Sequence, residues 1–417
     1  MKVVFLSQRF LFPQDTGGKI RTSKILEQLN KIFSLTVLSN MESPQDDPYL
    51  PEMERICDKF IPVPWVETKR YTLQWYLEVL KKSFSRYPVP MLNDYSAELE
   101  RAVLDELNRQ SYDLAICDFM QSTLNFQHVK NIPRLLFQHN VEATIAQRHM
   151  QRAKDPFFKI FWWLQFKKMF YHEKKQCGLF DRVIAVSEND KLRMEDWYGV
   201  NNVCTIPTGV DTEFYAATKN SKEKKQIVFV GAMDWLPNDD AMKYFLNSIF
   251  PLIQKQEPGA HFIIVGRNPS PALKKTINKI PNVKLTGWVE DTRPYIAESA
   301  VFIVPIRIGG GTRMKIYEGM AMGKAIVSTS IGAEGLPVKH GEHIYLADTE
   351  TRFAEYVIKL LQNTENRQRM GMGARQYVYN NFRWKKVAEA FANICQETVK
   401  RNNTNALKSA ESLMTSH

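Results

Sequence analysis

The sequence predicts an α/β protein built from two Rossmann-like domains that face a central cleft. The first observation is that short apolar runs, typical of buried parallel strands, alternate with amphipathic helical patterns along most of the chain. The second is length, because 417 residues exceed the usual size of one domain and suit two. The third is a polar, charged segment at residues 216–226 (AATKNSKEKKQ), which separates two such halves.

These patterns also predict where the domains begin and end. We expect the first domain over residues 1–210 and the second over residues 211–380. A helix over residues 381–400 follows, and we expect it to cross back to the first domain. The polar end of the chain, residues 401–417, is expected to form a disordered tail.

Composition excludes several classes of protein. No run of about 18 apolar residues is present, so no transmembrane helix is expected, and the chain enters a strand pattern at once, without a secretory signal. The net charge is +11, but no nucleic-acid-binding motif is present, so nucleic acid is not an expected partner. Five scattered cysteines without paired spacing indicate reduced thiols rather than disulfides or a metal site. We expect a cytoplasmic protein that can also contact the inner face of the membrane.

The chain opens with a strand–helix–strand unit. Lys2–Ser7 reads as a buried strand, Lys19–Lys31 as an amphipathic helix and Leu35–Ser39 as the second strand. A loop ending in the glycine pair Gly17 and Gly18 joins the first strand to the helix. The spacing is not GxGxxG, so a dinucleotide fingerprint is not supported, and a plain turn remains the alternative to a ligand contact at this pair.

Two spans of the first domain mix aromatic residues with lysine and arginine. They are residues 63–90 and residues 156–180, the second reading PFFKIFWWLQFKKMFYHEKKQCGLF. Aromatic faces with interleaved cations suit a membrane interface. They equally suit a helix with one buried and one solvated face, and the sequence leaves both interpretations open.

Polar residues follow the buried strand Arg134–Gln138. His139 comes directly after it, and Glu142 lies three residues further on. Open α/β sheets bind ligands at the carboxyl ends of their strands, so both residues are candidates for substrate contact. By its chemistry His139 could hydrogen-bond or orient a bound substrate, although a structural loop histidine is the alternative.

The second domain contains a strand, a glycine-rich loop, a helix and a strand in direct succession. The strand is Ala300–Pro305, the glycines are Gly309, Gly310 and Gly311, the helix is Met314–Met322, and the last strand is Ala325–Ser328. Gly323 is a typical helix stop. Glycines allow a ligand to approach the backbone, and the free N–H groups of a helix N-terminus attract anions.

The side chains at this helix start point to a nucleoside diphosphate. Thr312 supplies a hydroxyl and Arg313 and Lys315 supply two cations, which suit a diphosphate. Glu318 lies about one turn further on, where a carboxylate could accept hydrogen bonds from the two hydroxyls of a ribose. A triglycine can also be a flexible loop beside a solvated helix face, but the flanking strands and the cations favour a binding site.

The stretch GGGTRMKIYEGMAMGKAIVSTSIGAEGL, residues 309–336, closely resembles the donor-site signature of retaining GT-B-fold glycosyltransferases of family 4. The likeness is greatest to sugar transferases of bacterial exopolysaccharide clusters. The resemblance implies that Glu318 binds the nucleotide ribose and that Arg313 and Lys315 bind the diphosphate. It also implies an acceptor-binding first domain and a donor-binding second domain.

The chain departs from the family pattern in two places. The family has E-x7-E, and here Gly310 stands where the first Glu, which normally touches the donor sugar, would be. The family also carries an Arg and a Lys in the loop that corresponds to residues 231–238, and this chain has neither there. Backbone amides of residues 309–312 are the expected substitute for the Glu, and Arg313 and Lys315 for the missing cations. Asn238 is expected to cap a helix that starts at Asp239.

The resemblance assigns further substrate contacts. Gly17 and Gly18 are expected near the donor diphosphate and the acceptor, His139 near the reacting sugar, and Glu142 near the acceptor. Three residues of the second domain complete the expected donor site. Backbone groups of Trp288 and Val289 are expected to bracket the base, and Glu334 in the IGAEGL loop is expected to contact the substrate. The Trp288 side chain could equally belong to the core.

The expected reaction moves a sugar from a nucleotide diphosphate sugar to an acceptor hydroxyl, the acceptor being a lipid-linked or growing saccharide of the cell surface. The expected catalytic residues are His139, Arg313 and Lys315. No D-x-D motif is present, so neither a metal ion nor another cofactor is expected. Retention of the anomeric configuration follows from the resemblance alone. The alternatives are a sugar-nucleotide 2-epimerase of the same fold and a non-catalytic, nucleotide-binding scaffold in a polysaccharide assembly complex.

Overall fold

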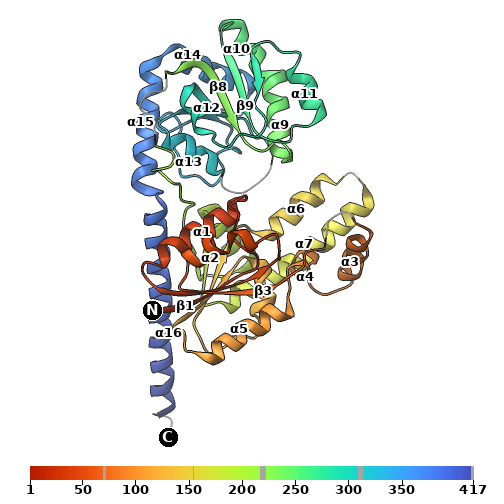
Figure 1. The fold of residues 1–417 in the computed structure, drawn as a ribbon, viewed down its shortest axis with the longest axis vertical. Helices are drawn as coiled ribbons and strands as arrows, with labels where there is room; N and C mark the ends of the chain where they lie inside the picture. Colours follow the sequence, from red (N-terminus) through yellow and green to blue (C-terminus); the bar gives the residue numbers. More distant parts are fainter. Residues whose placement is uncertain (69–71, 154, 217–221, 309–312, 415–417) are drawn as a thin grey trace. The chain divides into compact units, whose positions relative to one another are not determined.

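The computed structural model describes residues 1–68, 72–153, 155–216, 222–308 and 313–414, with side chains as far as residue 404 (Figure 1). By its internal contacts the chain separates into two compact domains. The first contains Met1–Pro207 together with the residues from Lys385 onward, and the second contains Thr208–Trp384. The contacts therefore place the boundary between Pro207 and Thr208, where the sequence led us to expect it after residue 210.

The described part of the first domain is built on a seven-stranded, fully parallel sheet with the order β3-β2-β1-β4-β5-β6-β7. Its central strands are buried on both faces, because helices cover both sides of a parallel sheet. The strands are β1 (Lys2–Ser7), β2 (Ser34–Met41), β3 (Lys59–Pro64), β4 (Leu114–Asp118), β5 (Arg134–Gln138), β6 (Arg182–Ala185) and β7 (Val203–Thr205).

Helices connect these strands. They are α1 (Gly17–Leu29), α2 (Leu50–Arg55), α3 (Leu73–Ser83), α4 (Val89–Asn93), α5 (Ala97–Arg109), α6 (Glu142–Arg152), α7 (Pro156–Leu179) and α8 (Glu188–Tyr198), with 3-10 turns η1 (Asp47–Tyr49) and η2 (Met120–Phe126). The glycine pair at residues 17 and 18 forms the first turn of α1, where a loop was expected. Thr16 takes the extended backbone conformation of a residue that precedes a helix, so the helix starts two residues early.

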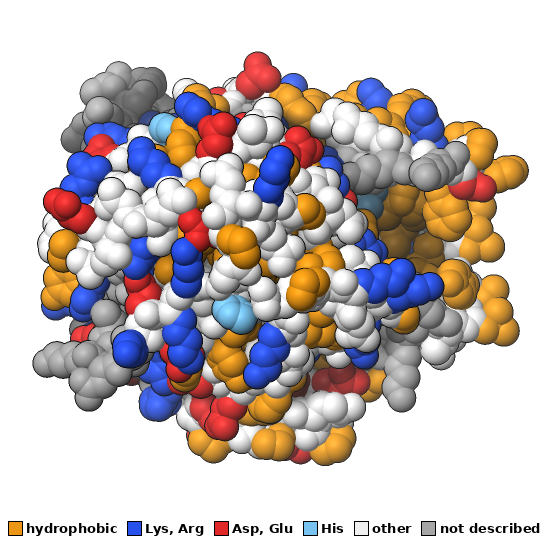
Figure 2. Space-filling view, turned by 90° about the horizontal axis from the view of Figure 1, so that it is seen from above, with side chains coloured by type: hydrophobic (Ala, Val, Ile, Leu, Met, Phe, Trp, Pro, Cys, Tyr) orange, Lys and Arg blue, Asp and Glu red, His pale blue; other side chains and the backbone are white. Residues whose placement is uncertain are grey.

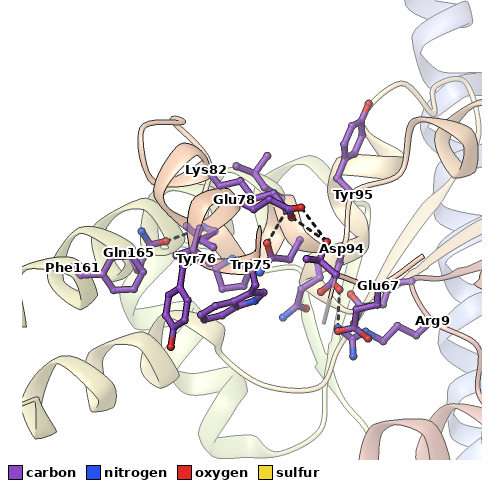
Figure 3. Close-up of a pocket in the computed structure, with 18 of the residues that line it drawn as sticks. Arg9, Glu67, Trp75, Tyr76, Glu78, Lys82, Asp94, Tyr95, Phe161 and Gln165 are labelled. Carbon is purple, nitrogen blue, oxygen red and sulfur yellow. Dashed lines mark hydrogen bonds and ion pairs between the residues drawn. The ribbon is translucent and has the colours of Figure 1, made fainter. Parts of the chain in front are cut away.

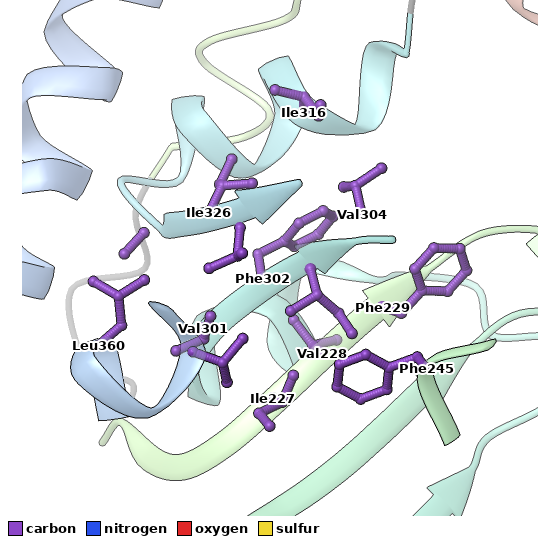
Figure 4. Close-up of a cluster of buried hydrophobic side chains, with 14 of the residues drawn as sticks. Ile227, Val228, Phe229, Phe245, Val301, Phe302, Val304, Ile316, Ile326 and Leu360 are labelled. Atoms are coloured by element: carbon purple, nitrogen blue, oxygen red, sulfur yellow. The ribbon is translucent and has the colours of Figure 1, made fainter. Parts of the chain in front are cut away.

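The described part of the second domain has a six-stranded parallel sheet with the order β10-β9-β8-β11-β12-β13. Phe229, Phe302 and Ile326 from neighbouring strands are fully buried, and Phe245 and Ile316 from helices pack on the same core (Figure 4). The strands are β8 (Lys224–Val230), β9 (His261–Val265), β10 (Val283–Leu285), β11 (Ser299–Val304), β12 (Ala325–Ser328) and β13 (Tyr345–Leu346).

The helices of this domain follow the same alternation. They are α9 (Leu236–Tyr244), a π-turn η3 (Phe245–Ile249), α10 (Phe250–Gln256), α11 (Pro271–Ile277), α12 (Arg293–Glu298), α13 (Met314–Ala321), α14 (Glu350–Gln362) and α15 (Thr364–Asn381). Helix α13 stops as predicted, since Gly323 adopts a left-handed φ of +69° that a side chain would disfavour.

The last helix, α16, extends over Trp384–Met414 (Figure 1). The sequence led us to expect its end at residue 400 and a disordered tail from residue 401, whereas the structure is helical as far as Met414. Buried Val387, Phe391 and Cys395 anchor its first half in the first domain. Once such a nucleus is packed, each further residue adds a backbone hydrogen bond to an existing helix, which favours continuation through a polar sequence.

Candidate functional site

The predicted donor site lies at the N-terminus of α13, close after the carboxyl end of β11. Three predicted residues are placed there: Arg313 precedes the helix with an extended backbone, Lys315 lies in its first turn, and Glu318 lies one turn further. The glycines Gly309, Gly310 and Gly311 and the hydroxyl of Thr312, which we expected to contact the diphosphate, lie outside the described residues. The described part of the site therefore consists of the two cations and the carboxylate.

Arg313 is held by an aromatic face. Only 6% of the residue is exposed, and its guanidinium carbon lies 4.8 Å from the centroid of the Trp235 ring. Trp235 occupies the position just before α9, in the loop where the family usually places its own cations. A guanidinium over an indole ring is attracted by the ring quadrupole and keeps a fixed orientation. The loop thus contributes the support for Arg313, although it has no cation of its own.

Lys315 is held by the same loop. Its Nζ donates a hydrogen bond of 3.1 Å to Oδ1 of Asn238 and lies 4.2 Å from the centroid of the Phe229 ring. The Asn238 Nδ2 donates to the carbonyl of Ala232 at 2.8 Å, which turns the amide oxygen towards Lys315. The prediction that Asn238 caps a helix is therefore wrong: α9 starts at Leu236, and the amide side chain supports a cation instead.

Gly231 makes room for this arrangement. A Cβ atom at Gly231 would lie 2.6 Å from the Nζ of Lys315 and 2.7 Å from the Nδ2 of Asn238. Both distances are shorter than non-bonded contacts allow. The end of β8 must therefore lack a side chain if Lys315 is to reach Asn238.

The charge of Lys315 is poised. Burial and, to a smaller extent, the positive charge of Arg313 lower its pKa to about 7, while the carboxylate of Glu318 opposes both effects. At neutral pH the amine is therefore divided between its charged and neutral forms. An anion bound beside it would favour the charged form.

Glu318 is paired with a residue that the sequence did not single out. Burial raises the pKa of Glu318, while Lys315 and a hydrogen bond from the Tyr215 hydroxyl oppose the shift. The same pairing and burial raise the pKa of Tyr215, so its phenol stays protonated and donates. Tyr215 lies four residues after the stretch Thr208–Asp211 (TGVD), and nothing in the local sequence indicates its contact with Glu318, about a hundred positions away. This hydrogen bond fixes the orientation of the carboxylate.

The remaining predicted donor residues, Trp288, Val289 and Glu334, differ in their exposure. Trp288 follows Gly287, which has a left-handed φ of +76°, and its side chain is 70% exposed, so it is not part of the core. Val289 is half-buried and packs against the core of the domain. Glu334 is half-buried in the turn after β12, with its backbone N–H donating to the carbonyl of Ile331 at 3.3 Å.

In the first domain, His139 lies at the carboxyl end of β5 with both ring nitrogens engaged. Its Nε2 lies 2.7 Å from Oδ1 of Asp118, and its Nδ1 lies 3.0 Å from Nη1 of Arg21. An arginine can only donate, so Nδ1 accepts, and the ring proton lies on Nε2 and is donated to Asp118. Burial lowers the pKa of His139, as does the charge of Arg21, while Asp118 opposes them, which favours the neutral imidazole.

Asp118 and Arg21 were not predicted. Asp118 ends β4, and its other oxygen accepts a hydrogen bond of 3.0 Å from the hydroxyl of Thr22 in α1. Burial lowers the pKa of Arg21 to about 10 despite the nearby carboxylates. The one sequence signal available was that Asp118 follows an apolar strand next to β5, the same signal that indicated His139. The contact with α1 could not be inferred from spacing.

The predicted glycine pair connects to His139 through one ring. The Phe119 ring is stacked on His139 with centroids 3.7 Å apart and planes at 4°. A Cβ at Gly18 would lie 2.6 Å from the tip of the Phe119 ring. Gly18 therefore allows α1 to approach the ring that packs on the histidine, which is a packing role in the described structure. Gly17 lies beside it in the first turn of α1.

Glu142 starts α6 and is partly buried. Burial raises its pKa to about 7, and the side chains of Gln121 and Asn140 hydrogen-bond its carboxyl group. Its backbone N–H donates to Oε1 of Glu173 in α7 at 2.9 Å. A carboxyl group with a pKa near neutrality can accept or release a proton under ordinary conditions.

The described residues contain no group of three or more His, Cys, Asp or Glu side chains placed to hold a metal ion. They also contain no helix that is long and apolar enough to cross a membrane.

Comparisons with known proteins agree with the two-domain architecture. Residues 224–363 match the family described as glycosyl transferases group 1, and residues 63–214 match glycosyltransferase family 4. A protein of Klebsiella pneumoniae, described as an uncharacterized 44.6 kDa protein in the cps region, is 23% identical over 411 residues, which are 95% of this chain and 99% of that protein.

Solved structures of similar fold cover nearly the whole chain. Sucrose-phosphate synthase from Thermosynechococcus elongatus aligns with a TM-score of 0.69 at 14% identity, over 95% of this chain and 98% of that one. HepE from Anabaena, solved in complex with UDP and glucose, aligns with a TM-score of 0.65 at 13% identity, over 95% of this chain and 100% of that one. At such identities the likeness shows the fold alone.

The two parallel-sheet domains and these structures define the GT-B fold. The family matches in both halves of the chain then support its assignment as a GT-B glycosyltransferase, with a family 4 domain followed by a group 1 domain.

Proposed function

We propose that this glycosyltransferase moves a sugar from a nucleotide diphosphate sugar to a hydroxyl group of a saccharide acceptor used in cell-surface polysaccharide synthesis. The observation that carries the proposal is the pair of cations at the N-terminus of α13, supported by Trp235 and Asn238, with Glu318 one turn away. Two cations suit a diphosphate, and an oriented carboxylate suits the hydroxyls of a ribose. The cps-region relative supports the polysaccharide context.

In this proposal the reaction proceeds by electrostatic stabilisation of the leaving group. The diphosphate gains negative charge as the bond to the sugar breaks, and Arg313 and Lys315 would stabilise it without a metal ion. Since Lys315 has a pKa of about 7, the developing charge also favours its protonated form. Retention of the anomeric configuration, hexose as the transferred sugar and a membrane-associated acceptor are further parts of the proposal that rest on the family resemblance.

The first domain would supply the acceptor side. His139 is expected near the reacting sugar, oriented by Asp118 and Arg21. Because both ring nitrogens are engaged, a sugar hydroxyl would contact this group by exchanging one of those hydrogen bonds or through Asp118. Glu142, with a pKa near 7, is the expected contact for the acceptor hydroxyl.

A thermal-shift panel tests the donor half of the proposal. UDP, GDP and ADP, with their common sugar conjugates, are added to the full chain in the presence of EDTA. A nucleotide at a hundred times its dissociation constant should stabilise the folded protein by about 2.7 kcal/mol. Selective stabilisation by one diphosphate with EDTA present is the expected result, and Lys315→Ala should remove it. A shift that requires added divalent metal would overturn the metal-free part.

Product analysis tests the transfer half. Incubation with the stabilising nucleotide sugar and saccharide acceptors should release the nucleoside diphosphate and yield a glycoside with the donor's anomeric configuration, read by proton NMR. Conversion of the nucleotide sugar to its 2-epimer without an acceptor would favour the epimerase instead. Binding without turnover of any acceptor would favour a nucleotide-binding scaffold.

A further inference from the structure

The first domain contains a pocket of about 1010 Å³ whose lining includes none of the residues assigned so far to the proposed reaction. It lies between the segment after β3, helices α3 and α4, and the first half of α7. Its walls include large apolar side chains from all of these elements: Trp65, Trp75, Val79, Leu92, Phe161 and Trp162. A pocket of this size can hold several sugar rings or a long hydrocarbon chain.

The two ends of the pocket differ in chemistry. Figure 3 shows Phe161 at one end, Trp75 in the middle, and Arg9, Glu67 and Asp94 at the other end. At the polar end Nη2 of Arg9 donates to Asp94 at 2.9 Å and lies 3.7 Å from Glu67. Carboxylates and a guanidinium in this arrangement can accept from and donate to sugar hydroxyls.

The polar end adjoins the expected acceptor site. Gln121 lines the pocket, and its side chain hydrogen-bonds the carboxyl group of Glu142. Asp94, also in the lining, is close enough to raise the pKa of Glu142. Glu142 was expected to contact the acceptor, so a sugar at the polar end would lie next to it.

Helix α3 turns an apolar face to solvent. None of its described residues is buried, and its outward apolar side chains recur three or four residues apart, as on one face of an amphipathic helix. The exposed apolar residues of α3 and the position after it are Leu73, Tyr76, Leu77, Leu80 and Phe84. The opposite face, with Trp75 and Val79, forms one wall of the pocket.

Helix α7 has an unusual distribution of side chains. Its buried face is largely polar, because Glu173 and Gln176 are buried there and Glu173 accepts hydrogen bonds from α6. Its exposed side chains include large apolar ones near the start of the helix: Phe157, Phe158, Ile160, Trp163 and Leu164. Clustered exposed apolar side chains usually mark an interaction site. Figure 2 shows hydrophobic side chains gathered on the side where α3 and α7 lie.

The pocket wall continues into this exposed face. Tyr76, Phe157 and Phe158 line the pocket and are also more than half exposed. Exposed cations on the same helices and next to them, among them Lys81, Arg86, Lys159 and Lys167, complement an anionic lipid surface. A free saccharide would occupy the polar end alone and would leave the aromatic wall and both apolar faces in water.

We propose that this pocket binds an amphiphilic acceptor, a saccharide joined to a hydrocarbon chain. Its sugar would lie at the Glu67 and Asp94 end, beside Glu142, and its chain would follow the aromatic wall to the exposed face of α3 and α7. The inference rests on the proposed function, because it names the class of acceptor for that reaction. The pocket would select the acceptor by its hydrocarbon chain, whereas the donor would be selected in the other domain.

Alkyl glucosides test the pocket without any turnover. Methyl, hexyl, octyl and decyl glucoside, each below its micelle concentration, are titrated into the full chain by calorimetry. Each methylene buried in an apolar wall strengthens binding about two- to fourfold, so decyl glucoside should bind at least about a hundredfold more tightly than methyl glucoside, at one molecule per chain. Equal affinity across the series, or non-saturating uptake of many molecules, would overturn the proposal.

Matched variants locate the binding. Phe161→Ala shortens a side chain inside the pocket and should weaken decyl glucoside about tenfold, and Trp75→Ala on the surface helix α3 provides a second variant if the first does not fold. Leu192→Ala is the control, since Leu192 of α8 is 59% exposed and does not line the pocket. Equal effects of Leu192→Ala and both pocket variants would contradict the assignment.

The donor assay separates this inference from the proposed function. Nucleotide stabilisation is measured on the same proteins and should be unchanged in all three variants. Retained nucleotide binding and transfer to free saccharides, without chain-length dependence, would sink the amphiphile pocket and leave the glycosyltransferase intact. Chain-length-dependent binding without nucleotide binding would do the reverse.

Discussion

In the proposed donor site, the charge of Lys315 would depend on whether a diphosphate is bound. In the free protein its pKa is about 7, so the amine loses its charge as the pH rises through neutrality. A bound diphosphate favours the charged form and raises the pKa. Binding between these two pKa values therefore takes up a proton, and affinity must fall as the pH rises.

The prediction concerns the pH dependence of nucleotide-sugar binding. Affinity should increase by up to about tenfold per pH unit as the pH falls from about 9 to 7, and level off below about 7, where the free amine is already charged. A nucleotide sugar is used because its diphosphate has no titrating proton in this range. Calorimetry at each pH, in buffers of different ionisation enthalpy, measures both the affinity and the proton uptake.

Lys315→Met provides the control for that titration. The variant should bind more weakly by about 1.5 to 3 kcal/mol at pH 7, the loss expected for a charged hydrogen bond, and its affinity should be flat from pH 7 to 9. A wild-type slope that persists in Lys315→Met would assign the proton to another group. Lys274→Ala, an exposed lysine of the same domain, should behave as wild type.

Gly231 gives a second prediction at the scale of single residues. Gly231→Ala places a Cβ against the Nζ of Lys315 and the amide of Asn238, so it should displace the cation and weaken nucleotide-sugar binding about tenfold or more. Gly259→Ala is the matched control, since a Cβ there meets nothing within 4 Å. Thermal shift with and without nucleotide separates loss of binding from loss of folding. Unchanged nucleotide affinity in Gly231→Ala would show that binding does not depend on the contact between Lys315 and Asn238.

At the scale of elements, α7 supports the start of α6 through one carboxylate. Oε1 of Glu173 accepts from Gln138 at 2.8 Å and from the backbone of Glu142 at 2.9 Å. Oε2 accepts from the backbone of Ala143 at 2.8 Å and from the Tyr198 hydroxyl at 2.6 Å. Two of these donors, the backbone N–H groups of Glu142 and Ala143, belong to the first turn of α6, where N–H groups have no acceptor within the helix.

Removing that carboxylate should loosen α6. Glu173→Ala leaves four donors without their acceptor in a buried site and should lower the free energy of unfolding by about 3 kcal/mol. Urea denaturation measures the loss, and hydrogen exchange should show faster exchange in α6 than in α14 of the other domain. Lys174→Ala, the exposed neighbour on α7, should change neither quantity. Uniformly faster exchange in both helices would contradict a local supporting role.

The elements themselves were largely predictable from the sequence. The buried strands β1, β5 and β11 are apolar runs with breakers at their ends, and α13 ends at a glycine where the pattern said it would. Such signals are local, because the residues that define a strand or a helix stop are neighbours in the chain. The extension of α16 was not predicted, because the polar sequence after residue 400 carries no local helix signal and its support comes from the packing of the first half of the helix.

The partners of the site residues were not predictable in the same way. Asn238 and Tyr215 meet Lys315 and Glu318 across about 80 and 100 residues of sequence, and an isolated sequence carries no signal for such a pairing. The family resemblance indicated that residues 231–238 lack the usual cations, but only the structure shows that Trp235 and Asn238 there hold the cations of α13.

At the scale of the whole molecule, the donor and acceptor functions are assigned to separate compact domains. The cations and Glu318 belong to Thr208–Trp384, whereas His139, Glu142 and the amphiphile pocket belong to Met1–Pro207. Each domain has its own sheet and its own core. A ligand that binds one domain should therefore protect that domain first from local opening.

Hydrogen exchange followed by mass spectrometry tests this separation. With EDTA present throughout, the stabilising nucleoside diphosphate should slow exchange in α9 and α13, where Asn238 and Lys315 lie, and leave α3 and the start of α7 unchanged. Decyl glucoside should give the opposite map. Lys315→Ala should erase the first pattern alone, and Phe161→Ala the second alone. Protection of α3 by the nucleotide, or of α13 by the glucoside, would show that the two sites are not independent. Protection by the nucleotide that appears only when a divalent metal ion replaces EDTA would show that the proposed donor site needs a metal ion.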